Sequence, residues 1–349
     1  MLSSLGDAAA LSGMALLVAL SAAQAGPLLN DFVRPVVRRI VVLTDDDTDA
    51  LPRCIARGTD IEIADVIRLN GRSNLNTVAK QLDVDELRRN RIWCIVVASR
   101  DQKCLPVELL LRCRFHDIPV LSEAAFWEQE TWRIKVDAGD ASWFLGGQGF
   151  RHTRIERIGK RLFDLSVAVA LLLFTLPLTL LVALLIRCDS RGPIFYLQQR
   201  VGLSGRTFTM YKFRSMVEDA EIAGQPIWAS ERDPRITRVG KFIRYTRIDE
   251  LPQLLNVLRG DMSIIGPRPE RPYFVKQLAE TIPLYDTRHW IKPGITGWAQ
   301  VNASYTDSVQ GAREKLELDL YYLKNRSIFL DLLILVRTFR VVLLQQGAR

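Results

Sequence analysis

The sequence predicts an α/β protein with three parts: an N-terminal Rossmann-like α/β domain without a cofactor motif, a membrane re-entrant helix hairpin, and a small α+β domain with interfacial helices. Three observations predict this fold class. Short apolar stretches alternate with helix-like stretches over residues 36–135, an apolar segment runs from Leu162 to Ile186, and mixed polar sequence returns after it. The length of 349 residues allows two domains together with membrane segments.

The composition favours anionic partners. The formal net charge is +8 at pH 7, which favours polyanions, anionic lipid or phosphate-bearing substrates. The five cysteines form no CxxC pair and their number is odd, so we expect reduced thiols in a cytosolic compartment rather than disulfides or a zinc site. The three histidines lie far apart in the sequence, which argues against a histidine-based metal site.

Residues 1–35 contain a short hydrophobic segment, Ala8–Ala25. No lysine or arginine precedes it, which argues against a secretory signal. Arg34, Arg38 and Arg39 follow it, so the positive-inside rule places residue 31 onward in the cytoplasm, with the segment as a short membrane helix or anchor. A loosely attached surface helix is the alternative.

Residues 36–135 have the pattern of a doubly wound α/β domain. Helical stretches such as Thr77–Asn90 and Pro106–Phe115 separate four segments that are typical of buried strands. These segments are Arg39–Thr44, Ile61–Ile67, Ile92–Ala98 and Ile118–Leu121.

The stretch after the first strand lacks the glycines of a dinucleotide-binding turn. Its acids, from Asp45 to Asp49, would repel a pyrophosphate. Asp45 and Asp47 match a DxD metal–nucleotide motif, but acids are also favoured at a solvated helix start by the helix dipole. We favour the second interpretation, because DxD alone is a weak signal, and therefore expect this domain to serve regulation or assembly.

A glycine-bearing linker over residues 136–150 leads to a basic helix and then to the apolar segment. The basic residues between Arg151 and Arg161 suit an anionic cytoplasmic leaflet, each contributing on the order of 1 kcal/mol. Leu162–Ile186 is long enough to span a bilayer, but Pro177 lies near its middle and would kink it.

Basic residues flank the apolar segment on both sides, since Arg187 and Arg191 follow it. A spanning helix normally has its cations biased to one end, so cations at both ends favour a hairpin that enters and leaves through the cytoplasmic face. The alternative is the core helix of a soluble protein. After it, two short strands joined at Ser204-Gly205 are expected to form a hairpin.

A carboxylate pair, Asp249 and Glu250, precedes a helical pattern of leucines. Pro252 fits the first turn of that helix, so the pair lies at or just before a helix N-terminus, where free N–H groups favour anions. Arginines occur on both sides of the pair. The stretch is therefore either a solvated helix start or a phosphate-handling centre.

Two stiff loops follow the pair. In Ser263–Glu270, two prolines and a glycine hold Arg268 with little entropy to lose, which suits a phosphate clamp. In Ile291–Val301, Trp298 and Gln300 offer an aromatic ring and an amide to a base or sugar. The alternative is that both loops are ordinary turns, with Trp298 in the core.

Two helices are expected at the C-terminal end, Leu316–Lys324 and Ser327–Leu344. The second one suits the membrane interface or packing on the hairpin, and a plain core helix is the alternative.

Seven motifs, taken together, make residues 151–349 resemble the bacterial sugar transferases. This family comprises monotopic polyprenyl-phosphate sugar-1-phosphate transferases that initiate exopolysaccharide or glycan-lipid synthesis. The sequence departs from the family at Leu176-Pro177, where many members have Ser-Pro, and in having at most one membrane helix ahead of the α/β domain. The motifs are Lys160–Asp164, Gly192–Phe195, Gln199–Gly202, Lys212–Met216, Asp249–Gln253, Gly266–Glu270 and Pro293–Gly297.

The resemblance implies a reaction in which a UDP-sugar and polyprenyl (undecaprenyl) phosphate give polyprenyl-diphospho-sugar and UMP. It implies Asp249 as the nucleophile that forms a covalent phospho-sugar intermediate, with Glu250 handling the metal or the proton. Mg2+ is the implied cofactor, bound by the same two carboxylates. The residues implied in phosphate or substrate binding are Arg268, Arg244, Lys212, Arg214 and Gln300.

The implied partners are a UDP-sugar, polyprenyl phosphate and membrane lipid, but no nucleic acid. The implied location is the bacterial cytoplasmic (inner) membrane, with residues 151–349 as a catalytic domain facing the cytoplasm. Self-association and association with other polysaccharide-assembly proteins stay open, as does the identity of the sugar. The alternatives are a DxD glycosyltransferase that releases UDP and a non-catalytic membrane scaffold.

Overall fold

The computed structural model divides the chain into two compact units, Met1–Thr131 and Trp132–Arg349. The hydrophobic segment Ala8–Ala25, the acids Asp45 and Asp47, and most of the expected linker lie outside the described residues. The described residues are 37–44, 61–69, 78, 80–99, 105–136, 149–150, 153–217, 233–303 and 308–343.

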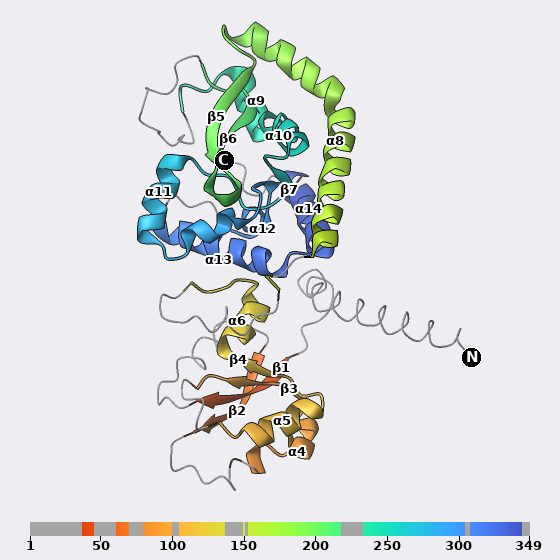
Figure 1. The fold of residues 1–349 in the computed structure, drawn as a ribbon, viewed down its shortest axis with the longest axis vertical. Helices are drawn as coiled ribbons and strands as arrows, with labels where there is room; N and C mark the ends of the chain where they lie inside the picture. The colour runs from red at the N-terminus through yellow and green to blue at the C-terminus, as the bar shows by residue number, and fades with distance from the viewer. Residues whose placement is uncertain are drawn as a thin grey trace, which may run out of the picture. The chain divides into compact units, whose positions relative to one another are not determined.

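The first unit contains a four-stranded parallel sheet in the order β2-β1-β3-β4 (Figure 1). β1 lies between β2 and β3, and its residue Val42 pairs with Val66 on one side and Val96 on the other. The four expected strands are confirmed to within two residues at each end. They are β1 (Arg38–Thr44), β2 (Ile61–Arg68), β3 (Ile92–Val97) and β4 (Val120–Ser122).

Helices cover both faces of this sheet, as the doubly wound pattern predicts. Alternate residues of β1 point to opposite faces, so Val41 and Leu43 belong to one apolar cluster and Ile40 to the other. Leu110 lies in the first cluster and Phe126 in the second. The helices are α4 (Val84–Arg89) and α5 (Val107–Phe115) on one face and α6 (Glu123–Thr131) on the other.

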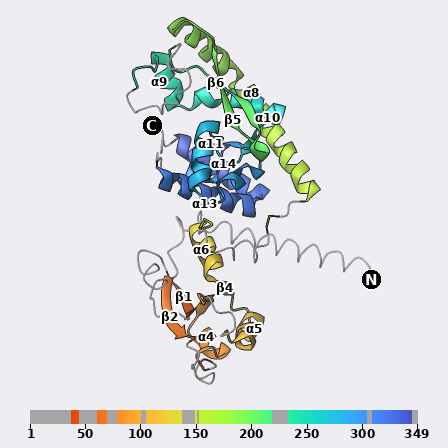
Figure 2. The ribbon, with the colours of Figure 1, turned by 60° about the vertical axis from the view of Figure 1, so that its left-hand side comes forward.

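The second unit begins with α8 (Arg154–Asp189), a single helix of 36 residues. Thr153 and Glu156 form a capping box at its start. The structure shows the expected hairpin segment as one continuous, bent helix (Figures 1 and 2). Its expected entry and exit through one face of the membrane stay a prediction. Pro177 lies inside α8, and Thr175 donates back to the carbonyl of Leu171, and both features bend a helix without ending it.

The middle of α8 is apolar and exposed. Leu173 is 68% exposed and Phe174 is 84% exposed. Within the described part of the chain, α8 is the one helix long and apolar enough to cross a membrane. The second unit therefore presents a continuous apolar helical surface.

Both ends of α8 pack on the same unit. Near its start, Arg161 donates to the carbonyls of Val257 and Leu258, at 2.7 and 2.9 Å. Near its end, Val182 and Ile186 pack with Phe213 and Ile243, and Asp189 accepts from the backbone N–H of Val239. The two ends of the apolar surface are thus fixed to one body.

The remaining elements of the second unit include the expected hairpin, β5 paired with β6 in antiparallel register. Its turn has positive φ at Ser204 and Gly205, as a tight turn requires. The elements are β5 (Phe195–Val201), β6 (Thr207–Phe213), α9 (Arg238–Tyr245), α10 (Gln253–Arg259), β7 (Ser263–Ile265), α11 (Pro272–Thr281), β8 (Gly294–Thr296), α12 (Trp298–Asn302), α13 (Val309–Asn325) and α14 (Ile328–Leu343).

The two stiff loops meet along the parallel pair β7 and β8. A Cβ on Gly294 would lie 2.1 Å from the backbone nitrogen of Gly266, and one on Gly297 would lie 2.1 Å from the oxygen of Gly266. This close approach needs glycine at both positions and fixes the start of the loop that carries Arg268. Trp298 is 2% exposed, so its core interpretation is confirmed.

A segment before α8, Trp132–Val136, packs on the second unit. The Trp298 indole N–H donates to the carbonyl of Trp132 at 3.1 Å, and the two rings lie 5.7 Å apart. The backbone N–H of Ile134 donates to the backbone carbonyl of Glu317 at 3.1 Å. The second unit therefore starts four residues before the expected linker.

The two C-terminal helices, α13 and α14, confirm the expected helical stretches. α14 buries one face, which includes Leu330 and Ile334. Its other face is apolar and exposed at Leu332, Val336 and Phe339. It is thus a core helix on one side and an unpaired apolar surface on the other.

Candidate active site

The carboxylate pair lies where the sequence predicts, just before a helix N-terminus. Asp249 and Glu250 belong to a short 3-10 turn, Ile248–Glu250, and Pro252 is the N-cap of α10. The turn begins after Arg247, which has the left-handed backbone conformation with φ 59. This conformation is uncommon for a residue with a side chain, and it turns the chain sharply into the pair.

Asn256 fixes α10 against β6, the strand that supplies Lys212. Its side-chain oxygen accepts from the Tyr211 backbone N–H at 3.0 Å, and its side-chain nitrogen donates to the Thr209 carbonyl at 2.7 Å. The buried amide thus replaces a neighbouring strand along this part of β6. As a result, Lys212 faces Glu250.

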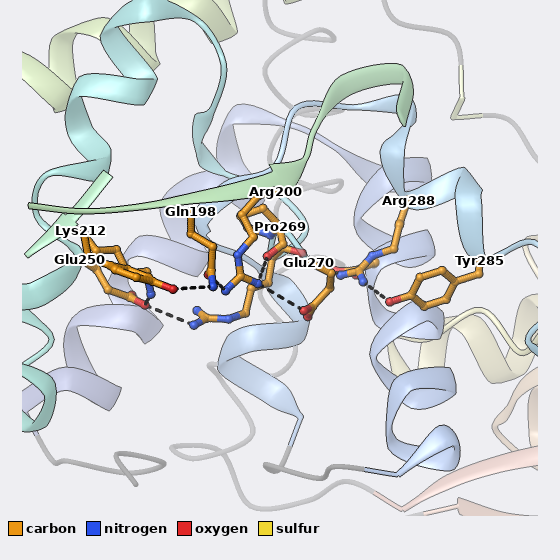
Figure 3. A network of polar contacts seen from close by, with 11 residues as sticks. Gln198, Arg200, Lys212, Glu250, Pro269, Glu270, Tyr285 and Arg288 are labelled. Atoms are coloured by element: carbon orange, nitrogen blue, oxygen red, sulfur yellow. Dashed lines mark hydrogen bonds and ion pairs between the residues drawn. The ribbon is translucent and has the colours of Figure 1, made fainter. Parts of the chain in front are cut away.

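Glu250 forms ion pairs with two cations through one oxygen. Its Oε1 lies 3.0 Å from Lys212 Nζ and 3.2 Å from Arg268 Nη2 (Figure 3). Burial alone would raise the pKa of Glu250, but Lys212, Arg268 and Arg247 together lower it well below its usual range. Burial also lowers the pKa of Lys212, which Glu250 opposes. Glu250 is therefore held ionised between two positive side chains.

Asp249 differs from its neighbour. It is 8% exposed, and among the residues that the structure describes its buried Oδ1 has no hydrogen-bond partner. Burial, together with the negative charge of Glu250, raises the pKa of Asp249 to about 6. An ionised carboxylate oxygen with no hydrogen bond is a stronger nucleophile or metal ligand than a solvated one.

The polar network continues from Arg268 to residues to which sequence reasoning assigned no role (Figure 3). Arg200 donates to Gln198 and lies 3.7 Å from the carboxylate of Glu270. Arg288 forms a buried ion pair with Asp319 at 2.8 Å. Arg200 and Glu270 lie inside two of the family motifs, Gln199–Gly202 and Gly266–Glu270, so the sequence does contain a signal for them. Arg288 lies in none.

Three other expected site residues lie apart from the pair or touch other groups. Arg244 lies in the last turn of α9 and helps to hold down the pKa of Asp249. Arg214 donates to the carbonyl and hydroxyl of Ser190, at 2.8 and 2.9 Å, next to the end of α8. Gln300 donates to the carbonyl of Ile295 at 3.0 Å. The structure thus brings Lys212 and Arg268, but neither Arg214 nor Gln300, into contact with Glu250.

The pair fits a magnesium ion only in part. Within the described ranges, no group of three or more His, Cys, Asp or Glu side chains is placed to hold a metal. The free Oδ1 of Asp249 and the adjacent carboxylate of Glu250 are hard oxygen donors, and Mg2+ usually takes one or two carboxylates plus substrate phosphates and waters. The donor set therefore suits an ion that arrives with a diphosphate.

Comparison with known proteins identifies the family. The chain is 43% identical over 270 residues to an N-acetylgalactosaminephosphotransferase of Aeromonas hydrophila whose name specifies UDP-N-acetylgalactosamine and undecaprenyl phosphate, covering 77% of this chain and 63% of that protein. It is 44% identical over 198 residues to an undecaprenyl-phosphate glucose phosphotransferase of Komagataeibacter xylinus, covering 55% and 37%.

A third relative is the UDP-glucose:undecaprenyl-phosphate glucose-1-phosphate transferase of Escherichia coli (strain K12), 40% identical over 188 residues, which cover 53% of this chain and 40% of the relative. The chain thus spans less than two thirds of the length of each of these relatives. The family described as bacterial sugar transferase matches residues 155–345, more than half of the chain. The chain therefore belongs to the bacterial sugar transferase family.

Proposed function

We propose that this protein transfers a sugar-1-phosphate from a UDP-sugar to undecaprenyl phosphate, giving undecaprenyl-diphospho-sugar and UMP. This is the initiating step of exopolysaccharide or glycan-lipid synthesis. The observation that carries the proposal is Asp249, which is buried beside the Glu250–Lys212–Arg268 cluster with a free oxygen. The names of the relatives support the same donor and acceptor classes.

In the first step, the Asp249 carboxylate attacks the phosphorus that carries the sugar. The new bond joins Oδ1 to phosphorus, and the bond to the bridging oxygen breaks, so UMP leaves with the electron pair. Arg268 holds the phosphate oxygens as negative charge shifts to the leaving group. Lys212 fixes Glu250 and adds positive potential at the site.

In the second step, a phosphate oxygen of undecaprenyl phosphate attacks the same phosphorus. The Asp249–phosphorus bond breaks, and the carboxylate is restored. The incoming phosphate attacks in its ionised form, so no proton has to be removed, and Glu250, with its lowered pKa, keeps Lys212 and Arg268 in place. Asp249 and Glu250 would also hold Mg2+, which supplies charge neutralisation on the diphosphate when bound.

The lipid acceptor gives α8 its role. Both of its ends pack on one unit, so a helix that crossed the bilayer and left its ends on opposite faces would break those contacts. We propose that the exposed apolar middle of α8 enters the cytoplasmic membrane from the cytoplasmic face and returns, with the outer face of α14 at the interface. The acceptor phosphate would then lie at the same level as the pair.

The test is a product assay on the full chain in membranes with undecaprenyl phosphate and a panel of UDP-sugars. UDP-N-acetylgalactosamine is the first donor to try, given the Aeromonas relative. We expect UMP as the released nucleotide. Release of UDP would instead indicate a glycosyltransferase, and no release with any donor would indicate a scaffold.

A further inference from the structure

The loop that carries Arg268 is held by its backbone to an unusual degree. Four consecutive carbonyls, from Pro267 to Glu270, each accept a hydrogen bond from a distant part of the second unit. Two of the donors are backbone groups: Gly294 N–H reaches Pro267 and Val201 N–H reaches Glu270, both at 2.9 Å. The other two donors are arginine side chains.

Arg288 donates to the carbonyl of Arg268 itself, at 3.1 Å. Its remaining contacts keep it in place, because it donates to Asp319 at 2.8 Å and to the Tyr285 hydroxyl at 2.7 Å. Its side chain is 5% exposed, and that of Asp319 is 2% exposed. A guanidinium so enclosed has no free face for a substrate.

Arg200 holds the next carbonyl. It donates to Pro269 at 3.1 Å, while its other terminal nitrogen donates to Gln198 (Figure 3). Its side chain is 16% exposed, and Glu270 balances its charge at 3.7 Å. Both terminal nitrogens are therefore engaged inside the protein.

Arg268 presents the opposite case. Its side chain is 41% exposed, and its ion pair is with Glu250 at 3.2 Å. Two enclosed arginines thus hold the carbonyl of the accessible Arg268 and that of the next residue, Pro269. Because the four carbonyls from Pro267 to Glu270 are all held, this loop loses little conformational entropy when Arg268 binds an anion.

We propose that Arg200 and Arg288 are positioning residues, which act on phosphate binding only through the placement of Arg268. This inference rests on the proposed function, in which Arg268 binds the donor phosphates. Lysine cannot replace either arginine, because its single ammonium cannot reach two or three acceptors in one plane.

The test is a double-mutant cycle on the full chain in detergent, with UDP as the probe and its Kd measured by calorimetry. Arg288→Lys should weaken UDP binding about tenfold when Arg268 is present. In an Arg268→Ala background the same change should alter the Kd for UDP less than about twofold, because the side chain that Arg288 positions is then absent. Equal factors in the two backgrounds would overturn the inference.

Arg200→Lys supplies a second cycle with the same expectation, and it lies nearer the surface in case Arg288→Lys does not fold. Arg161→Lys is the matched control, since Arg161 also holds two backbone carbonyls, those of Val257 and Leu258, but away from the Arg268 loop. It should change the Kd less than about twofold. A wild type that binds no UDP would overturn the proposed function together with the inference, whereas equal factors overturn the inference alone.

Discussion

The two units bury different kinds of side chain. In the described part of the first unit, every buried residue is apolar or a cysteine, as in the clusters around Ile40 and Leu43. The second unit buries charged groups at several places, among them Asp164, Asp249 and Arg288. An apolar core of the first kind needs only complementary shape, whereas a charged one needs a partner for each group.

Most buried charges of the second unit have that partner. Lys160 lies 2.9 Å from both Asp164 and Asp331. Asp249 differs: among the described residues it forms no ion pair and its Oδ1 has no hydrogen-bond partner, whereas Arg214, which also has unpartnered nitrogens, still donates to Ser190. The described part of the second unit therefore buries charge that the first does not, and the buried Asp249 carboxylate is the point at which we propose that the chemistry takes place.

The largest expected effect comes from removing the negative charge of Asp249. Asp249→Asn should reduce UMP release at least about 10³-fold, because an amide cannot form the phospho-sugar bond. The measurement is single-turnover UMP release together with a search for a phospho-sugar adduct on the protein. Turnover near the wild-type rate would remove Asp249 from its role as nucleophile.

The same variant should be more stable than the wild type. The pKa of Asp249 is raised in the folded protein, so the folded state binds the proton more tightly and stability falls as pH rises from about 4 to about 6. At pH 7 the ionised group destabilises the fold by on the order of 1–3 kcal/mol, which asparagine removes. Thermal unfolding at pH 7 checks this, and a lower melting temperature would contradict it.

Truncating a core side chain of the first unit should lower the stability of that unit without affecting the reaction. Phe126→Ala removes a fully buried ring and should destabilise the first unit by about 3–5 kcal/mol. UMP release by protein that is still folded should be unchanged. Chemical unfolding followed by Trp93 or Trp127 fluorescence reports on the first unit, and a proportional loss of activity would show that the units do not divide the work.

Glu250→Gln should destabilise the fold, whereas Asp249→Asn should stabilise it. The pKa of Glu250 is lowered, so its ionised form stabilises the fold above its unfolded pKa, and this is lost as pH falls. At pH 7 the variant leaves Lys212 without its carboxylate, which should cost about 2–3 kcal/mol, less than a fully buried pair because Arg268 is 41% exposed. The deficit relative to wild type should shrink below about pH 4, a trend that a pH series of melting temperatures measures.

The smallest stability effect is expected on α8. Phe174 is 84% exposed, so Phe174→Ser should change the unfolding free energy in detergent by less than about 0.5 kcal/mol, in contrast to the buried Phe126. It should nevertheless lower the fraction of protein that sediments with membranes, because it removes apolar area from the bilayer-facing surface. Unchanged partition on adding further serines at Leu173 and Leu180 would argue against membrane entry by this segment.

Much of the fold follows from local sequence. Alternating apolar runs identify the four strands of the first unit, and Pro252 places the carboxylate pair at a helix start. The stiffness of Ser263–Glu270 points to Arg268, which does meet Glu250. Each of these predictions depends on the spacing of residues that are close together in the sequence.

What local sequence misses depends on distant partners. Arg200 and Arg288 donate to backbone carbonyls 69 and 20 residues away, and a carbonyl is present at every residue. The path of α8 is a second case, because Pro177 predicts the bend, whereas only the packing of both ends on the second unit shows where the helix goes after it. Arg214 and Gln300 carry suitable groups, but their contacts lie elsewhere.

The segment Trp132–Val136 has a practical consequence for dividing the protein. It lies outside the range that matches the family, yet it accepts the indole hydrogen bond of Trp298 and covers that ring and Tyr321. A fragment cut at residue 151 would leave a buried N–H unsatisfied and expose two aromatic rings. Expression of the transferase half alone should therefore begin ahead of Trp132, where the chain already belongs to that half by its contacts.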